Sequence, residues 1–548
     1  MTHPPGSPDP SRAGSSVPAQ VLLDVPAPLP PEGFNFARDV LYRRAAASPS
    51  LPATVFVAED GSVETWSYVR MADTARRLAG AFSDAGIGRG DRVLLLMHRT
   101  PWWQATVSAC LHIGAVPVPC VTQASADDVA YRITRSGACA AVGERDVLGK
   151  FAGAAPAIRF ARGGGNGWID LEAAATGRED ALEPAPLRAD DPALMYFTSG
   201  SSGPPKAVLH ASRGVFVRGV QPWAQLGVGE GDLVWTSSDT GWTRAGSCLV
   251  FGPWTHGAAA LMVAAPPPPE ARAELLERFG VTVFGAVTTE LRLILAGAAA
   301  RRFPRLRWTL SAGEAMTAEM AERWQAFSGR PLLVGYGQSE TPTATLTDPS
   351  RPAANGMIGQ PMAGNRVAIV DPEGRECAPG VQGAIAFDAR DPGLMLGYFE
   401  DGVTRMPLLA GRWHLTGDTG TQDADGELYF VGRDDDIISS AGYRIGPTEI
   451  ENVLARHPAV EESAVVASPD PLRGEVVKAF VRLRAGHAGD ASLAVELQRF
   501  VQQRTAPFKY PRRIEFVDDL PRTVSGKIQR RVLREREFDA STGRGDER

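Results

Sequence analysis

The chain has 548 residues, of which 44% are hydrophobic and 22% are charged, and its formal net charge is −6 at a pI near 5.9. At about 100 to 200 residues per domain, this length allows three or four structural units, or one large body with a smaller satellite domain. The mildly acidic balance argues against a dedicated nucleic-acid binder, because such proteins neutralise phosphates with clustered basic residues. We therefore expect no nucleic-acid partner.

Three features bear on the compartment. The five cysteines are scattered and form no C-x-x-C pair, which predicts neither a disulfide framework nor a zinc site and fits a reducing cytoplasm. Residues 1–31 contain nine prolines and a single arginine, which is typical of a disordered tail and not of a signal or transit peptide. The longest apolar stretch, residues 245–265, is interrupted by Pro253 and His256, so no membrane span is expected.

The first two thirds of the chain predict an α/β body. Residues 93–97, 115–121 and 281–287 are short, apolar and often β-branched, as buried strands are. They alternate with helical patterns at residues 72–85 and 270–279. This alternation indicates layers of helices around largely parallel sheets.

The last third predicts two further units. Residues 371–430 contain short strands separated by Gly and Pro turns, which favours a small antiparallel sheet or β-barrel. From residue 434, helical segments at 447–456 and 493–504 and strands at 463–467 and 476–483 predict a small α+β domain. We therefore expect a tail at 1–31, an N-terminal domain at 32–433, a C-terminal domain at 434–537 and a second tail at 538–548.

A loop rich in glycine and hydroxyl groups follows the predicted strand at 193–197. It reads TSGSSGPPK over residues 198–206, and it can direct backbone N–H groups and hydroxyls at phosphate oxygens. It is not a P-loop, because Lys206 is followed by Ala207 and the G-x-x-x-x-G-K spacing is absent. A flexible linker is the alternative interpretation.

Lysine is rare in this chain, with five among the 57 basic residues. A lysine kept in a Gly-rich loop, as at Lys206 and Lys527, indicates a place that needs a compact ammonium. Lys150 and Lys478 are expected to be ordinary surface residues.

Six motifs in order resemble those of the adenylate-forming superfamily, which contains acyl-CoA synthetases, adenylation domains and luciferases. They are the loop at 198–206 and the segments 335–341 (GYGQSET), 416–418 (TGD), 432–436 (GRDDD), 441–445 (AGYRI) and 521–527 (PRTVSGK). Segments 34–40, 238–242, 468–478 and 506–512 resemble the medium-chain acyl-CoA synthetase branch. The similarity spans residues 33 to 537.

The resemblance implies an AMP-forming acyl-CoA ligase. With MgATP it would convert a carboxylic acid, expected to be a medium-chain fatty acid, to an acyl-adenylate with release of pyrophosphate, and then transfer the acyl group to CoA. Such chemistry depends on positioning and charge stabilisation, and the sequence has no G-x-S-x-G nucleophile elbow. The alternatives are a free-standing adenylation enzyme that loads a carrier protein, and a catalytically silent fold that binds acyl ligands or ATP.

The resemblance also assigns an ATP site. It gives the phosphates to Thr198, Ser199, Gly200, Ser201, Ser202, Gly203 and Lys206, the adenine to Gly313, Glu314, Ala315 and Tyr336, and the ribose to Asp418 and Arg433. It also counts Gly337, Gln338 and Ser339 among the ATP-binding residues. Glu340 would bind Mg²⁺. Lys527 would reach the α-phosphate and the carboxylate, and Lys206, Glu340 and Lys527 would be the catalytic residues.

The resemblance further places the CoA site, the acyl pocket and a hinge. CoA would contact Gln123, Ala441, Gly442, Tyr443, Arg444, Arg473, Tyr510 and Arg512, and the acyl pocket would contain Trp242, Thr243, Val287 and Gly337. Acetate-specific relatives carry Trp at the position of Gly337, so the glycine is expected to open the pocket. Asp435 matches the pivot of a mobile C-terminal domain. Arg244 could bind either a CoA phosphate or a polar group of the substrate. The sequence does not indicate the oligomeric state.

Overall fold

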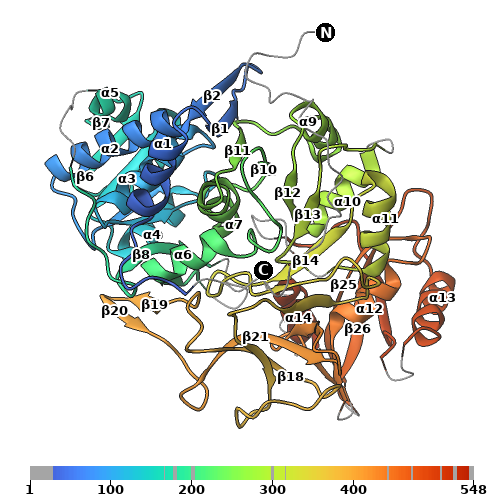
Figure 1. Ribbon diagram of the computed structural model, residues 1–548. Helices are drawn as coiled ribbons and strands as arrows, with labels where there is room; N and C mark the ends of the chain where they lie inside the picture. Colours follow the sequence, from blue (N-terminus) through green and yellow to red (C-terminus); the bar gives the residue numbers. More distant parts are fainter. Residues whose placement is uncertain are drawn as a thin grey trace.

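In the part of the chain that the structure describes, the strands form four sheets (Figure 1). The computed structural model describes residues 29–165, 167–176, 182–198, 204–297, 301–314, 316–440, 443–470, 473–505, 509–522 and 528–541. Within these residues, no helix has both the length and the apolar character needed to cross a membrane. The mixed α/β class predicted from the sequence is confirmed.

The N-terminal part contains a parallel sheet with the strand order β4-β3-β5-β6-β7. Its strands are β3 (Arg92–Leu96), β4 (Val116–Pro119), β5 (Ala140–Glu144), β6 (Ile158–Arg162) and β7 (Ile169–Asp170). The helices beside them are α2 (Tyr68–Asp84), α3 (Pro101–His112), α4 (Ala126–Ser136) and α5 (Leu171–Thr176). Ser125 starts α4 with a capping box to Asp128, so the chain turns sharply after β4.

A second, larger sheet forms the centre of the molecule. Its parallel section has the order β14-β13-β12-β10-β11-β1, with β2 antiparallel at the edge. The strands are β1 (Pro52–Val57), β2 (Val63–Ser67), β10 (Leu233–Thr236), β11 (Ala259–Val263), β12 (Val283–Ala286), β13 (Trp308–Ser311) and β14 (Leu332–Tyr336). The helices of this section are α1 (Arg43–Ala47), α7 (Thr243–Gly246), α8 (Gly252–Thr255), α9 (Arg272–Arg278), α10 (Thr288–Gly297) and α11 (Ala318–Ser328). Short 3₁₀ and π-type turns cover Ala37–Tyr42, Arg145–Phe151, Ser247–Phe251 and Pro269–Ala271.

The antiparallel region predicted at 371–430 divides between two sheets. β15 (Thr345–Leu346), β16 (Met357–Pro361), β17 (Val367–Val370), β18 (Gly383–Asp388), β21 (Trp413–Gln422) and β22 (Leu428–Arg433) extend the central sheet beyond β14. β19 (Gly397–Glu400) and β20 (Val403–Arg405) instead join β8 (Pro192–Phe197) and β9 (Ala207–Ala211), the strands that flank the phosphate loop. α6 (Ser212–Val220) follows β9 directly.

The C-terminal part is an α+β unit, as predicted, and Figure 1 shows it in orange and red below α11. Its elements are β23 (Ile438–Ser440), β24 (Tyr443–Ile445), α12 (Pro447–Leu454), β25 (Val460–Asp470), β26 (Gly474–Leu483), α13 (Ala491–Gln502), β27 (Arg513–Phe516) and α14 (Arg530–Ser541). This unit has its own hydrophobic cluster, which includes the buried residues Ile445, Leu454 and Val465. α14 continues past residue 537, where we expected the domain to end, because Leu533 packs in a second small core and Glu537 pairs with Lys478.

Candidate functional site

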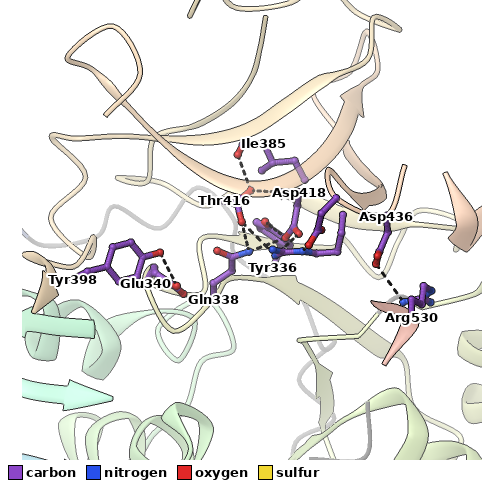
Figure 2. A network of polar contacts seen from close by, with 11 residues as sticks. Tyr336, Gln338, Glu340, Ile385, Tyr398, Thr416, Asp418, Asp436 and Arg530 are labelled. Atoms are coloured by element: carbon purple, nitrogen blue, oxygen red, sulfur yellow. Dashed lines mark hydrogen bonds and ion pairs between the residues drawn. The ribbon is translucent and has the colours of Figure 1, made fainter. Parts of the chain in front are cut away.

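Three predicted motifs meet in one hydrogen-bonded network (Figure 2). The Tyr336 hydroxyl donates to Asp418 Oδ2 at 2.6 Å, and Gln338 Nε2 donates to the same oxygen at 2.8 Å. Arg433 NH1 lies 3.0 Å from Asp418 Oδ1. Asp418 and Arg433 are register partners on β21 and β22, and Tyr336 ends β14. The three motifs, which are far apart in the sequence, are therefore brought close together by the strands of the central sheet.

Each residue of the Thr-Gly-Asp motif at 416–418 has a structural role in its strand. Thr416 Oγ1 donates to the Ile385 carbonyl at 2.7 Å and accepts the Asp418 amide at 3.1 Å. Gly417 has φ +71°, and a Cβ there would lie 3.1 Å from Arg433 NH2, so a glycine is needed at this position. Asp418 is thus held within a strand by its neighbours and is not an ordinary turn residue.

Burial controls the charges in this network. Asp418 is 6% exposed. Burial raises the pKa of the Asp418 carboxyl above its usual value, and the Arg433 guanidinium opposes that rise. Burial, and secondly the Asp418 charge, raise the pKa of Tyr336 well above its usual value, so its hydroxyl remains a donor at neutral pH. The paired carboxylate can accept hydrogen bonds from the two hydroxyls of a ribose.

A tyrosine that the sequence did not single out connects Lys206 with Glu340. The Tyr398 hydroxyl donates to Glu340 Oε1 at 3.0 Å, and Lys206 Nζ lies 4.9 Å from the centroid of the Tyr398 ring. Burial and the Glu340 charge raise the pKa of Tyr398 above its usual value. Tyr398 lies on β19, which pairs with β9, and only this pairing brings it to the site. No pattern in the sequence distinguishes it from the other tyrosines.

The phosphate loop closes a β-hairpin between β8 and β9. The Thr198 amide donates to the Lys206 carbonyl at 3.0 Å, and the Lys206 amide donates to Thr198 Oγ1 at 3.1 Å. Residues 199–203, which include Ser199, Gly200, Ser201, Ser202 and Gly203, lie outside the described residues. The Lys206 side chain is exposed, as a ligand-binding ammonium requires.

The donor set at Glu340 fits Mg²⁺ only together with substrate phosphates. Magnesium in nucleotide sites takes one or two carboxylates and completes its octahedron with phosphate oxygens and water. Among the described residues there is no group of three or more His, Cys, Asp or Glu side chains that could hold a metal ion. Glu340 is half-buried beside Lys206 and Tyr398, so it can offer one hard oxygen ligand to a metal–phosphate complex.

Hydrogen bonds connect the predicted adenine segment, residues 313–315, and the residue before it to neighbouring elements of the central sheet. The Glu314 carboxylate accepts the Thr289 amide at 2.8 Å in the first turn of α10. Arg244 NH1 donates to the Ala286 carbonyl at 3.1 Å, and its NH2 donates to the Ala312 carbonyl. Arg244 therefore holds the ends of β12 and β13 together. Gly313 adjoins this point, whereas Ala315 lies outside the described residues.

The predicted acyl residues Trp242, Thr243 and Val287 follow two strands of the central sheet. Trp242 is half-buried and packs against a core cluster that contains Cys120 and Val121. Val287 follows β12, and Thr243 begins α7. These acyl-pocket candidates therefore lie in the segments that follow β10 and β12, which are paired strands of the central sheet.

Gly337 has a packing reason of its own. A Cβ at Gly337 would lie 2.2 Å from the Pro342 carbonyl oxygen and 2.9 Å from Thr343 Cα. Any side chain here would force the 337–343 turn to move. The glycine is therefore required by a close backbone approach, and its effect on pocket size stays a prediction.

The predicted CoA residues are divided between the N-terminal part and the C-terminal unit, and those with described side chains lie in turns or bends. Gln123 is exposed after β4 in the N-terminal part. On the C-terminal unit, Arg512 NH1 donates to the Tyr510 hydroxyl at 3.0 Å, and the Arg473 amide donates to Asp470 Oδ1 at 3.0 Å. Ala441, Gly442 and Lys527 lie outside the described residues, and Tyr443 and Arg444 are described only as backbone of β24.

The segment between the two parts is held from both sides. Arg433 Nε lies 3.4 Å from Asp435 Oδ1, and the Asp435 carbonyl accepts a hydrogen bond from Arg534 on α14. Arg530 lies 4.0 Å from Asp436 and 2.6 Å from Glu451, so α14 also contacts the segment through a second arginine (Figure 2). Asp435 is exposed between these anchors, where a backbone pivot is sterically possible.

Replacing Asp435 with proline is expected to slow thioester formation at least tenfold more than acyl-adenylate formation. Proline fixes φ near −65° and restricts Asp434, so the segment could no longer adopt two backbone conformations. Each half-reaction is measured separately, by pyrophosphate exchange and by thioester formation from supplied acyl-adenylate. Asp435→Ala is the control and should leave both rates within threefold. A parallel fall of both rates in the proline variant would contradict the pivot.

Two lysines differ from their predicted role. Lys478 was expected on the surface, yet it is partly buried and pairs with Glu515 at 2.7 Å and Glu537 at 2.6 Å. Lys150 was also expected there, yet its Nζ donates to the Thr122 carbonyl at 2.6 Å. Both ammonium groups reach partners that are distant in sequence, which composition alone does not reveal.

Comparisons with known proteins identify the family. The family described as AMP-binding enzyme matches residues 41–399, and its C-terminal domain matches residues 449–527. Acyl-coenzyme A synthetase ACSM3, mitochondrial, of Pongo abelii is 36% identical over 93% of this chain and 90% of its own length. The crystal structure of Brucella canis acyl-CoA synthetase has a TM-score of 0.72 at 33% identity and covers 97% of this chain and 98% of its own. A benzoate CoA ligase from Burkholderia xenovorans LB400 has a TM-score of 0.78 at 28% identity, covering 91% of this chain and 100% of its own.

Proposed function

The chain belongs to the AMP-binding enzyme family and is an AMP-forming acyl-CoA synthetase, and from this premise we propose that its acid is a medium-chain fatty acid. ATP and CoA are its other substrates. The observation that carries the assignment of its site is the network in which Tyr336, Gln338 and Arg433 converge on Asp418. We propose that Asp418 accepts the ribose hydroxyls and that the Tyr336 ring packs on the adenine.

The two charged side chains beside Tyr398 would handle the phosphates. Lys206 and the hairpin loop would hold the β- and γ-phosphates, and Glu340 would bind Mg²⁺. When bound, Mg²⁺ neutralises phosphate charge that would otherwise repel the incoming carboxylate. Tyr398 orients Glu340 through its hydroxyl and gives the Lys206 ammonium an aromatic surface beside the site. We propose that Lys527 adds the positive charge at the α-phosphate.

The acyl pocket would lie among Trp242, Thr243, Val287 and Gly337. Neither Gly337 nor Val287 places an aromatic group there, which supports an acid longer than acetate. One methylene changes binding in an apolar pocket by about 1 to 3 kcal/mol, so chain length depends on several side chains and not on Gly337 alone.

The proposed acid is tested by measuring pyrophosphate release from MgATP with each of a series of acids, from acetate to dodecanoate and also benzoate. Each acid is assayed in the presence and in the absence of CoA. We expect a CoA-dependent optimum between butyrate and decanoate. Omission of Mg²⁺ should abolish release. An optimum at acetate or benzoate would contradict the medium-chain proposal, and release that does not respond to CoA would favour a carrier protein as the acyl acceptor.

The remaining proposals concern organisation. We propose a domain boundary near residue 434, supported by the separate core of the C-terminal unit, and a terminal tail at 1–31. The second tail, expected at 538–548, would begin later, because α14 extends to Ser541. The CoA residues Gln123, Arg473, Tyr510 and Arg512 would then approach one another only when the C-terminal domain rotates about Asp435.

We also propose a cytoplasmic location, because the scattered cysteines fit a reducing compartment, although the relative from Pongo abelii is named mitochondrial. Microscopy of a tagged chain tests the location.

A further inference from the structure

A buried carboxylate, Asp239, connects the loop after β4 with the loop after β10. Its Oδ2 accepts Thr122 Oγ1 at 2.6 Å, and the Thr122 amide lies 3.3 Å from Oδ1 and 3.4 Å from Oδ2. Asp239 Oδ1 also accepts the Gly241 amide at 3.0 Å. Asp239 is 8% exposed, and a carboxylate at that depth is costly unless hydrogen bonds satisfy it. The two loops are therefore coupled through Asp239.

Two further contacts tighten this coupling. Lys150 lies in the turn that follows β5, and its Nζ donates a hydrogen bond to the Thr122 carbonyl at 2.6 Å. A Cβ on Gly241 would lie 2.2 Å from the Val121 amide nitrogen, so the two loops touch through their backbones. Thr122 is thus held on both its amide and its carbonyl sides.

The coupled loops carry proposed ligands of two different substrates. Gln123, next to Thr122, is exposed and is a proposed CoA residue. Trp242, next to Gly241, is half-buried and is a proposed wall of the acyl pocket. The same carboxylate therefore determines how far the CoA-side loop lies from the acyl wall.

We infer that Thr122, Lys150 and Asp239 are positioning residues for the thioester-forming step, holding the Gln123 loop in register with the Trp242 loop so that the CoA thiol meets the acyl group. The inference rests on the proposed function. None of the three side chains needs to touch a substrate. Their effect should fall on CoA and not on ATP, because the Asp418 network lies on other strands.

The test replaces Thr122 with valine, which keeps the shape and removes the hydroxyl that binds Asp239. We expect the KM for CoA to rise about tenfold, the size that corresponds to losing one hydrogen bond to a charged group. The KM for ATP and the rate of acid-dependent pyrophosphate exchange should stay within twofold. Thr122→Ser keeps the hydroxyl and should restore the wild-type KM for CoA.

Thr100→Val is the matched control. Thr100 is a buried threonine that precedes α3 in the same N-terminal part, and its hydroxyl has no hydrogen-bond partner within the described part of the chain. Its KM for CoA should stay within twofold of wild type. Lys150→Met should raise the KM for CoA in the same direction as Thr122→Val, through loss of the contact on the carbonyl side.

The outcomes separate this inference from the proposed function. An unchanged KM for CoA in both Thr122→Val and Lys150→Met would overturn the inference, as would an equal loss of the ATP and CoA parameters. Failure of the wild-type enzyme to form any acyl-CoA would instead overturn the proposed function. In that case hydrogen exchange still tests the coupling, because amides at residues 121–124 should exchange faster in Thr122→Val and at the wild-type rate in Thr122→Ser.

Discussion

Replacing Lys527 with alanine is expected to lower the rate of acyl-adenylate formation by about 100- to 1000-fold, the usual cost of removing a group that stabilises charge in a transition state. The proposed role of its ammonium is to neutralise the negative charge that develops on the α-phosphate when the carboxylate attacks. Thioester formation from supplied acyl-adenylate should stay within threefold of wild type, because that step no longer involves the pyrophosphate leaving group.

The control for this experiment is Lys509→Ala. Lys509 belongs to the same C-terminal unit, but its Nζ forms an ion pair with Glu449 at 2.6 Å. Lys509→Ala should keep the rate of acyl-adenylate formation within threefold of wild type. An Arg at position 527 keeps the charge with a different shape, and we expect it to recover less than a tenth of the lost rate. An equal loss of both half-reactions in Lys527→Ala would contradict the assignment.

Replacing Asp418 with alanine is expected to reduce kcat/KM for ATP about 100-fold or more. The proposed contacts to the ribose are two hydrogen bonds to a charged group, and each contributes about 1.5 to 3 kcal/mol. The change also removes the common acceptor of Tyr336, Gln338 and Arg433, so the Arg433 guanidinium loses the carboxylate that balances its charge. Steady-state kinetics and direct titration with ATP measure the effect.

Asp423→Ala provides the matched control. Asp418 lies within β21, and Asp423 directly follows this strand and likewise accepts a tyrosine hydroxyl, from Tyr429 at 3.1 Å. Asp423 differs in that it lies in the turn at the far end of the β21–β22 pair. Its kcat/KM for ATP should stay within threefold of wild type. If Asp418→Ala also stays within that range while its melting temperature is unchanged, Asp418 does not hold the ribose.

The sequence predicted the elements well where the period of the apolar residues was clear. The helix expected at 72–85 is α2 (Tyr68–Asp84), and the strands expected at 93–97 and 281–287 are β3 and β12. Each of these segments has one dominant hydrophobic pattern, so local burial alone decides its structure. The strand expected at 463–467 is the longer β25 (Val460–Asp470), because its full pairing with β26 extends beyond the apolar core of the segment.

The sequence did not predict how the antiparallel strands divide between sheets. Residues 371–430 have a uniform pattern of short strands and turns, yet β18 and β21 extend the central sheet whereas β19 and β20 pair beside the phosphate hairpin. That choice depends on contacts with β9 and β22, which lie far away in the chain. It is also the choice that brings Tyr398 to Glu340.

By itself, the sequence determined the fold class, the reaction class and the motifs of the site, because these depend on residue types at fixed local spacings. The tertiary structure alone decided which partners those residues meet. In the structure, Asp418 pairs with Arg433, Arg244 donates hydrogen bonds to two backbone carbonyls, and Asp239 accepts a hydrogen bond from Thr122. The physical reason is that buried charges must find hydrogen-bonding partners, and those partners are supplied by strands that are neighbours in space and not in sequence.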